Sequence, residues 1–211
     1  MTEQNKGLFI TLEGIEGAGK SSAISCISNW LTEHNLPFVV TREPGGTELA
    51  ERIRTCVTEP SNEPICIKAE LLLMFAARAQ HIEQVIKPSL AAGICVVSDR
   101  FVDASYAYQG AGRNIPEVWL DQLTAMVVSQ AMPDATFILD VPVKVGMSRI
   151  QQRNSLDRIE QEHNDFFEKV RLSYLERARQ EPTRIKVIDA NQSIDKVHDA
   201  LVNELRTLVH D

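Results

Sequence analysis

A glycine-rich octapeptide at residues 14–21 (GIEGAGKS) constrains this chain more than any other segment. It has the form G-x-x-x-x-G-K-[ST] and lies between an apolar run and a helical pattern. The glycines let backbone N–H groups turn toward one anion, and the N-terminus of the following helix adds positive potential. Lys20 can reach the β- and γ-phosphates, and the hydroxyl of Ser21 can ligate Mg²⁺. The octapeptide therefore predicts a nucleoside triphosphate site where a strand meets a helix.

Short apolar runs alternate with segments of helical periodicity along the chain. The predicted strands are residues 7–12, 38–41, 94–98, 136–140 and 185–189. The predicted helices are residues 20–32, 48–57, 69–92, 116–131, 143–153, 166–180 and 194–209. Strands without polar alternation, separated by helices, favour a parallel sheet that is buried on both faces. We therefore expect one domain over residues 1–211, an α/β three-layer sandwich with a five-stranded parallel sheet and helices on both faces.

The net charge opposes one broad class of function. The 211 residues include 22 Lys and Arg against 29 Asp and Glu, a formal net charge of −7. A sequence-independent nucleic-acid binder is normally basic, so we expect no nucleic-acid partner. No apolar run approaches the ~20 residues that span a bilayer, and the first residues lack the apolar core of a signal peptide. We therefore expect no membrane partner and a cytoplasmic location.

The four cysteines indicate neither a metal site nor a redox pair. Cys26, Cys56, Cys66 and Cys95 form no C-x-x-C pair and do not stand near a histidine at zinc spacing. We expect them to be buried thiols in a reducing compartment.

Charged residues follow the second and third predicted strands. In parallel α/β sheets, ligands bind beyond the carboxyl ends of the strands. Asp99 can approach a metal ion or its bound water there, and Arg100 can bind a second phosphate; the alternative is a helix-capping Asp with a solvated Arg. Arg42 and Glu43 would flank the same cleft, unless the Pro-Gly-Gly segment after them is only a surface turn.

An arginine stands among apolar residues in the predicted helix at 69–92. Met74, Arg78 and His81 share one face of this helix. An unpaired buried charge is costly, so Arg78 needs a partner. That partner is Glu70, another internal carboxylate, or a ligand. On its own, His81 indicates only a structural or surface position.

Two further segments have the chemistry of a nucleotide site. The segment YAYQG at residues 106–110 offers aromatic rings that can wall a nucleoside and, in Gln109, an amide that can read a base edge. Arg149, Arg153 and Arg158 form an arginine-rich helix and loop that could close over a transferring phosphoryl group. The alternatives are structural aromatics in the first segment and a solvated basic face in the second.

Taken in order, these features resemble the bacterial thymidylate kinases. The matching segments are the octapeptide and residues 42–47 (REPGGT), 76–81 (AARAQH), 99–101 (DRF), 107–110 (AYQG) and 156–160 (LDRIE). The resemblance implies a P-loop nucleoside monophosphate kinase-like fold with a mobile lid at about residues 148–160. It also implies phosphoryl transfer from ATP, with Mg²⁺, to dTMP, and a homodimer.

The resemblance also implies roles for individual residues. The ATP site would comprise Gly14, Glu16, Gly17, Ala18, Gly19, Lys20, Ser21 and Ser22. The dTMP site would comprise Glu43, Arg54, Met74, Phe75, Arg78, Arg100, Ser105, Tyr108 and Gln109. The catalytic residues would be Lys20, Arg100, Arg149 and Arg153, and the metal residues Ser21 and Asp99. Arg78 and Gln109 match the thymine readers, and Glu16 matches a carboxylate near the acceptor nucleotide.

The chain departs from parts of the family at two positions. Some members carry a catalytic arginine in the phosphate loop where this chain has Gly17. The positive charge must then come from the lid, through Arg149, Arg153 or both. Many members stack a Phe on thymine where this chain has Met74, so either Met74 or the adjacent Phe75 would take that place.

Two other classes compete with this interpretation. A GTP-dependent switch needs an N-K-x-D guanine reader and a D-x-x-G segment, and the sequence has neither; Asp99, for example, is followed by Arg-Phe-Val. A kinase for another nucleoside monophosphate would keep the same phosphate machinery and remains the main alternative.

Overall fold

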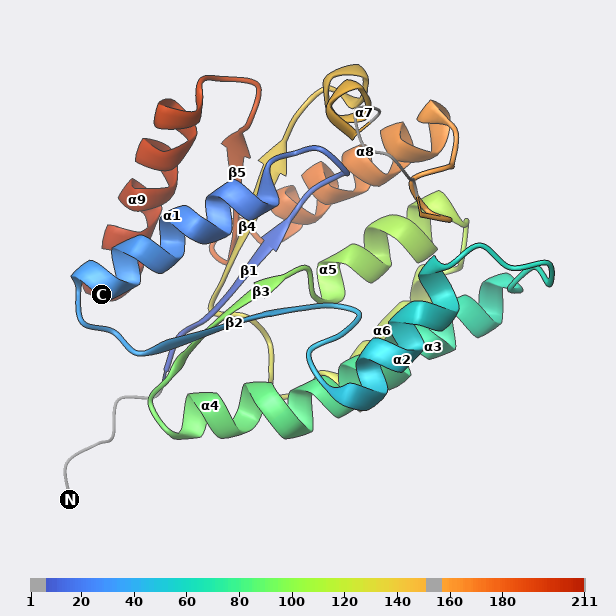
Figure 1. Ribbon diagram of the computed structural model, residues 1–211, viewed down its shortest axis with the longest axis horizontal. Coiled ribbons are helices and arrows are strands. Elements are labelled where there is room, and N and C mark those ends of the chain that lie inside the picture. Colours follow the sequence, from blue (N-terminus) through green and yellow to red (C-terminus); the bar gives the residue numbers. More distant parts are fainter. Residues whose placement is uncertain (1–6, 151–156, 211) are drawn as a thin grey trace.

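The computed structural model of the protein describes residues 7–150 and 157–210. Five parallel strands form one sheet in the order β2-β3-β1-β4-β5 (Figure 1). The strands are β1 Phe9–Glu13, β2 Phe38–Arg42, β3 Cys95–Asp99, β4 Ala135–Asp140 and β5 Ile185–Asp189. Their carboxyl ends lie at the same edge of the sheet, which confirms the predicted parallel α/β sheet.

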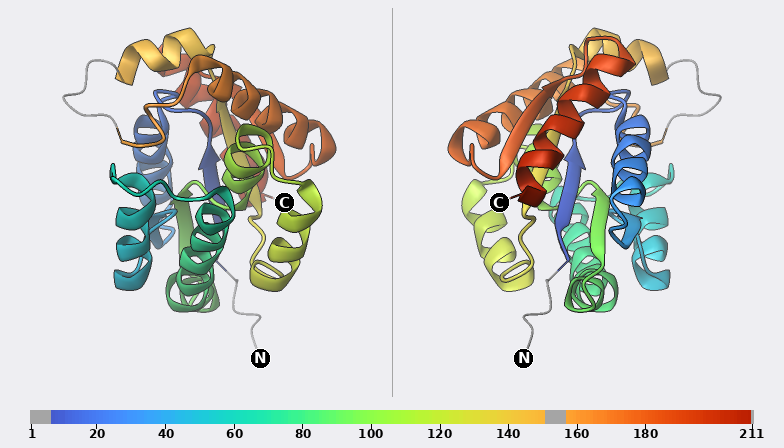
Figure 2. Two further views of the ribbon diagram at one scale, coloured as in Figure 1. Left: turned by 90° about the vertical axis from the view of Figure 1, so that its right-hand side faces the viewer. Right: turned by 90° about the vertical axis from the view of Figure 1, so that its left-hand side faces the viewer.

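Helices cover both faces of the sheet (Figure 2). On one face α1 and α9 pack against each other, and on the other lie α3, α4, α5, α6 and α8. The α-helices are α1 Lys20–Glu33, α2 Glu48–Thr58, α3 Ile67–His81, α4 Lys87–Ala91, α5 Val102–Ser105, α6 Glu117–Val127, α7 Val143–Ile150, α8 Asn164–Gln180 and α9 Ile194–His210. Two π-helical segments, η1 Ile82–Ile86 and η2 Tyr106–Gly112, interrupt the helical layer.

In β1 and β3, neighbouring side chains enter different hydrophobic cores. In β1, Ile10 and Leu12 join the core that contains α1, whereas Phe9 joins the core that contains Phe75 of α3. Every residue of β1 is buried, as expected for a strand covered by helices on both faces.

The predicted helix at 69–92 is three segments in succession: α3, η1 and α4. Gly93 follows them with φ 74°, a conformation that suits glycine and ends the helix. Sequence periodicity missed the helical segments α5 and η2. Part of the predicted lid, residues 151–156 with Arg153, lies outside the described residues, so the single domain with a mobile lid stays a prediction.

Two expectations about the remaining surface had different outcomes. Cys56 and Cys66 are exposed, so the expectation of four buried thiols was wrong for these two. Cys56 lies in the last turn of α2, and Cys66 stands directly before α3. Among the described helices, none is both long and apolar enough to cross a membrane.

Candidate active site

The octapeptide forms a tight loop between β1 and α1. Gly17 and Gly19 have φ values of 71° and 98°, which a residue with a Cβ adopts only with strain. A Cβ on Gly17 would lie 2.1 Å from the carbonyl oxygen of Gly146 in α7, so the two backbones pack directly on each other. The Lys20 ammonium donates to the carbonyl oxygens of Gly14 and Ile15 at 3.2 Å each and so lies over the loop.

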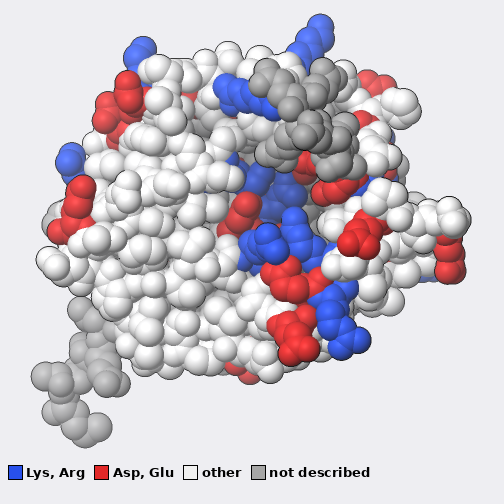
Figure 3. Space-filling view, viewed as in Figure 1, with Lys and Arg blue, Asp and Glu red and all other residues white. Residues whose placement is uncertain are grey.

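The loop opens onto a hollow that is lined by charged side chains. Figure 3 shows basic side chains gathered there with acidic side chains around them. We call this the charged hollow; its ionisable lining residues are Glu16, Lys20, Arg42, Glu43, Arg54, Asp99, Arg100, Arg149, Asp157 and Glu160. Burial and the neighbouring Arg100 lower the pKa of Lys20. Such a concentration of cations above a phosphate loop suits a polyphosphate.

Asp99 and Ser21 could hold a divalent cation in this hollow. Both line it, from the end of β3 and the first turn of α1. Oδ1 of Asp99 is buried and has no hydrogen-bond partner within the described chain. An orphaned carboxylate oxygen beside a hydroxyl fits Mg²⁺, which takes few protein ligands and several phosphate or water oxygens. The described residues include no cluster of three or more His, Cys, Asp or Glu that could bind a metal on its own.

Arg100 stands between the charged hollow and a second, more enclosed cavity. Its Nη2 donates to Oε1 of Glu16 and to the hydroxyl of Tyr108, at 2.7 Å each. Burial would raise the pKa of Glu16, but the charges of Arg100 and Lys20 outweigh it and lower the pKa. Glu16 therefore lines both the charged hollow and the second cavity, and its predicted places in the ATP site and near the acceptor stay predictions.

The second cavity, which we call the acceptor cavity, brings most of the predicted dTMP residues together. Its lining includes Glu43, Arg54, Met74, Arg78, Arg100, Ser105, Tyr108 and Gln109. Phe75 lies instead in the core, with the guanidinium of Arg78 4.7 Å from its ring centroid. Met74 therefore lines the acceptor cavity and Phe75 does not, whereas which of the two would stack on thymine stays a prediction.

The buried guanidinium of Arg78 makes three hydrogen bonds within the chain. Its Nε donates to Oε2 of Glu43 at 2.7 Å, Nη1 to the hydroxyl of Ser105 at 3.0 Å, and Nη2 to the carbonyl of Phe101 at 2.9 Å. The internal carboxylate is thus Glu43. His81 is fully buried and bonds through Nδ1 to the other oxygen of Glu43, which confirms a structural position for this histidine.

Both oxygens of Glu43 are therefore engaged by Arg78 and His81. The carboxylate lines both hollows but is directed at α3. Its predicted role in placing Mg²⁺ and phosphates stays a prediction, and its contacts are those of a residue that positions Arg78.

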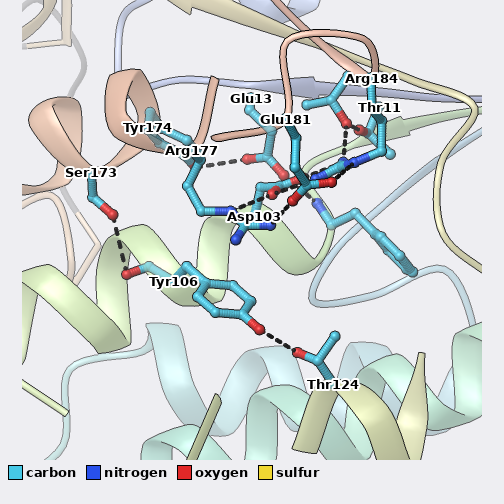
Figure 4. A network of polar contacts seen from close by, with 12 residues as sticks. Thr11, Glu13, Asp103, Tyr106, Thr124, Ser173, Tyr174, Arg177, Glu181 and Arg184 are labelled. Carbon is cyan, nitrogen blue, oxygen red and sulfur yellow. Dashed lines mark hydrogen bonds and ion pairs between the residues drawn. The ribbon is translucent and has the colours of Figure 1, made fainter. Parts of the chain in front are cut away.

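Glu13 supports the unusual backbone at Arg100, a role that no sequence pattern indicated. Arg100 has φ 70°, a left-handed conformation that is strained for arginine. The next backbone N–H, that of Phe101, donates to Oε1 of Glu13 at 2.7 Å, and the hydroxyl of Tyr174 donates to Oε2 at 2.6 Å (Figure 4). Burial and the charge of Asp103 raise the pKa of Glu13 to about 8.

A buried ion cluster lies next to Glu13 and was also missed. Asp103 is fully buried and accepts hydrogen bonds from Arg177 and Arg184 at 2.8–3.0 Å (Figure 4). Burial would raise the pKa of Asp103, but Arg184 and Arg177 outweigh it and lower the pKa. The cluster joins α5, the end of α8 and the residue before β5, so it anchors the helix from which Ser105 reaches the acceptor cavity. Pairing across such distances in the sequence leaves no local pattern.

Comparison with known proteins decides the family. The model of the family described as "Thymidylate kinase" matches residues 12–201. The chain belongs to the thymidylate kinase family. The thymidylate kinase of Marinomonas sp. (strain MWYL1) is 49% identical over 203 residues, 96% of each chain, and that of Ectopseudomonas mendocina (strain ymp) is 52% identical over 202 residues, 94% of this chain and 96% of the relative.

A solved structure supports the same assignment. The crystal structure of thymidylate kinase from Ehrlichia chaffeensis superposes with a TM-score of 0.78 at 33% identity, covering 95% of this chain and 99% of that chain. The fold is therefore the P-loop nucleoside monophosphate kinase-like fold that the resemblance implied.

In this member of the thymidylate kinase family, the remaining predicted residues are placed as follows. Arg149, near the end of α7, donates through Nη1 to the carbonyl of Gly17 at 3.0 Å and so lies over the phosphate loop. Arg54 lines both hollows and donates to the carbonyl of Pro44 at 3.0 Å. The side chain of Ser22 bonds to His198 of α9 at 3.0 Å, so only its backbone remains for the predicted ATP site. Arg153 lies outside the described residues.

Proposed function

We propose that this chain phosphorylates dTMP to dTDP, with ATP as the phosphate donor. The observation that carries the proposal is membership of the thymidylate kinase family together with an acceptor cavity that adjoins the phosphate loop through Arg100. The donor would lie in the charged hollow with its phosphates on the loop, and the acceptor in the enclosed cavity. Arg100, between them, would bind the acceptor phosphate with Arg54.

Catalysis in this arrangement is positioning and charge stabilisation. An oxygen of the dTMP phosphate attacks the γ-phosphorus of ATP in line, the bond to the β-phosphate oxygen breaks, and ADP leaves. Lys20 and the loop N–H groups balance the charge of the transferring group, with Arg149 and Arg153 supplying the rest. Mg²⁺, when bound by Ser21 and Asp99, supplies charge neutralisation to the donor phosphates.

Base selection would rest on the two polar readers of the acceptor cavity. Arg78 and Gln109 both line it, and Met74 provides an apolar surface for the ring. Ser105 and Tyr108 would line the sugar and base. Buried polar groups reject a base that leaves them unpaired, so thymine should be favoured over cytosine and the purines.

The test is coupled ADP release with MgATP against dTMP, dUMP, dCMP, dGMP and AMP, with a control that lacks any acceptor. We expect strong turnover with dTMP and weaker turnover with dUMP. Turnover with a different monophosphate instead would keep the phosphate chemistry and overturn Arg78 and Gln109 as thymine readers. ATP binding without turnover on any acceptor would overturn the proposal.

We also propose a homodimer in the cytoplasm, paired through α3 and α6. Leu72, Trp119 and Met126 are 58%, 37% and 71% exposed and line one groove between these helices. A two-fold axis through the groove would bury this surface against itself. Light scattering after size exclusion should give twice the chain mass, and the double variant Leu72→Glu, Met126→Glu should give a monomer; a wild-type monomer would refute the dimer.

A further inference from the structure

A buried carboxylate stands directly behind the amide that faces the acceptor cavity. Glu70, on α3, is 2% exposed. Its Oε1 accepts from Nε2 of Gln109 at 2.9 Å and from Nε of Arg113 at 3.4 Å. Its Oε2 accepts from Nη2 of Arg158 at 2.6 Å. Three segments distant in the sequence therefore converge on one carboxylate.

Glu70 is held in its ionised form. Burial would raise the pKa of Glu70, but the hydrogen bond from Gln109 and the charges of Arg113 and Arg158 outweigh burial and lower the pKa. An ionised carboxylate only accepts hydrogen bonds and cannot donate one. Its neighbours must therefore present donors to it.

This requirement fixes the orientation of the Gln109 amide. A side-chain amide carries a donor NH₂ and an acceptor oxygen of nearly the same size, so only its surroundings decide which points where. If the amide of Gln109 were turned over, its oxygen would face Oε1 of Glu70 at about the same 2.9 Å, with no proton between them. The NH₂ group must face Glu70, and no described residue donates a hydrogen bond to Oε1 of Gln109, which remains for the cavity that this side chain lines.

Arg78, the other polar side chain proposed to read the base, offers hydrogen-bond donors to the cavity. The guanidinium of Arg78 has five N–H donors, of which three are used by Glu43, Ser105 and the carbonyl of Phe101. The cavity therefore presents leftover donors on Arg78 and an acceptor on Gln109. An imide edge, with a carbonyl next to an N–H, matches this pair. Cytosine has an amino group next to a bare ring nitrogen, so both positions would oppose it.

We propose that Glu70 is a positioning residue that makes the cavity specific for a base with an imide N–H, by locking Gln109 with its oxygen toward the base. The inference rests on the proposed function, since it concerns the acceptor of that reaction. Glu70 does not touch the base and acts only through Gln109. Arg158, near the end of the predicted lid, also links Glu70 to α2, because its Nε donates to the carbonyl of Val57 at 2.8 Å.

The decisive variant is Glu70→Gln, which replaces one carboxylate oxygen by an NH₂ group and changes almost no volume. The new amide would keep its oxygen toward Arg158, the closer arginine at 2.6 Å, and turn its NH₂ toward Gln109, giving up the longer 3.4 Å contact to Nε of Arg113. Gln109 would then present its own NH₂ to the cavity, which suits the bare ring nitrogen of cytosine. The matched control is Glu162→Gln, which removes another carboxylate from Arg113, bonded at 2.6 Å, without touching Gln109.

The measurement is kcat/KM of each variant for dTMP and for dCMP, with MgATP saturating. In Glu70→Gln we expect kcat/KM for dTMP to fall, that for dCMP to rise, and their ratio to drop by about tenfold or more. In Glu162→Gln the ratio should stay at the wild-type value. A parallel fall for both substrates in Glu70→Gln, or an equal drop of the ratio in both variants, would mean a merely structural role and would overturn the inference.

Failure of the proposed function would give a different result, because the wild-type enzyme would then show no preference for dTMP over the other monophosphates.

If Glu70→Gln does not fold, the binding of ligands to the wild-type protein tests the inference instead. Calorimetry would compare dTMP with its 3-methyl derivative, which lacks the imide N–H. We expect the derivative to bind at least about tenfold more weakly. Equal binding would show that Gln109 does not accept from that N–H and would overturn the inference.

Discussion

Arg78 and Glu43 form an ion pair whose side chains are each 3% exposed, with Nε of the arginine 2.7 Å from Oε2 of the carboxylate. The pair joins α3 to the segment after β2, and the fully buried His81 completes it. Because neither charge reaches water, removing one partner strands the other. The same pair positions a side chain that lines the acceptor cavity, so we expect one contact to affect both stability and the binding of dTMP.

Replacing Glu43 with alanine should therefore weaken both the stability of the fold and the binding of dTMP. We expect Glu43→Ala to lower the free energy of unfolding by about 3–5 kcal/mol and to raise KM for dTMP. Urea denaturation and steady-state kinetics measure the two effects. The control Glu176→Ala removes a carboxylate that is 54% exposed beside Arg179 and should change stability by at most about 1 kcal/mol. Equal effects of the two variants would contradict the prediction.

Replacing Lys20 should lower the catalytic rate while leaving the fold intact. It already bonds two loop carbonyls, so it is positioned before any phosphate arrives. Replacing Lys20 with alanine should lower kcat by about 10²–10³-fold, the usual effect of losing one pre-positioned donor to developing charge. Circular dichroism should remain that of the wild type. The exposed lysine of α7 gives the comparison: Lys144→Ala should keep wild-type kcat, and a similar loss there would argue against a specific role for Lys20.

The arginines of the predicted lid should supply transition-state charge. An arginine delivered to a transferring phosphoryl group is worth about 10³–10⁵ in rate. We expect Arg149→Ala or Arg153→Ala to lower kcat while dTMP still binds with its wild-type Kd. Rapid-quench kinetics and calorimetry separate the two quantities. Unchanged kcat in both single variants and in the double variant would remove the lid from the mechanism.

Glu13 should give the fold a specific dependence on pH. Its pKa is raised by burial from 4.5 to about 8, so the native state binds this proton more tightly than the unfolded chain does. The resulting stabilisation is complete below the unfolded pKa and is lost as the pH rises through about 8. Urea unfolding between about pH 5 and pH 9 should show wild type losing stability relative to Glu13→Gln. In the control Glu33→Gln, at an exposed position, the free energy of unfolding should vary with pH as it does in wild type. The same pH dependence in Glu13→Gln and wild type would refute the prediction.

The sequence predicted the elements that leave a local pattern. Apolar runs and glycines were enough to predict all five strands and the loop around Lys20, because burial on both faces and positive φ restrict the residues at those positions. Asp99 and Arg100 were found from the rule that ligands bind at the carboxyl ends of parallel strands. Whether Met74 or Phe75 lines the cavity depends on the actual rotation of α3, because adjacent residues of a helix point about 100° apart.

The residues that support the site from behind could not be predicted from the sequence. Glu13 meets Tyr174 across 161 residues, and Asp103 meets Arg184 across 81. Such pairs form only when the sheet order and the helix layers are known, and neither partner stands in a motif. Segment η2 was missed for another reason. Apolar residues that recur with a period of about 3.6 residues indicate an α-helix, and a π-helix has a different period.

The contact between Gly17 and Gly146 also constrains how such a chain can evolve. Two backbones touch there with no side chain between them, so bulk added at either position must displace the other segment. An arginine at position 17 would collide with the carbonyl of Gly146 before it could reach a phosphate. If Arg149 of α7 supplies the catalytic charge, as we propose, one substitution could not move that charge to position 17. The packing of two glycines would then close one mutational route and leave the neighbouring helix as the place for that charge.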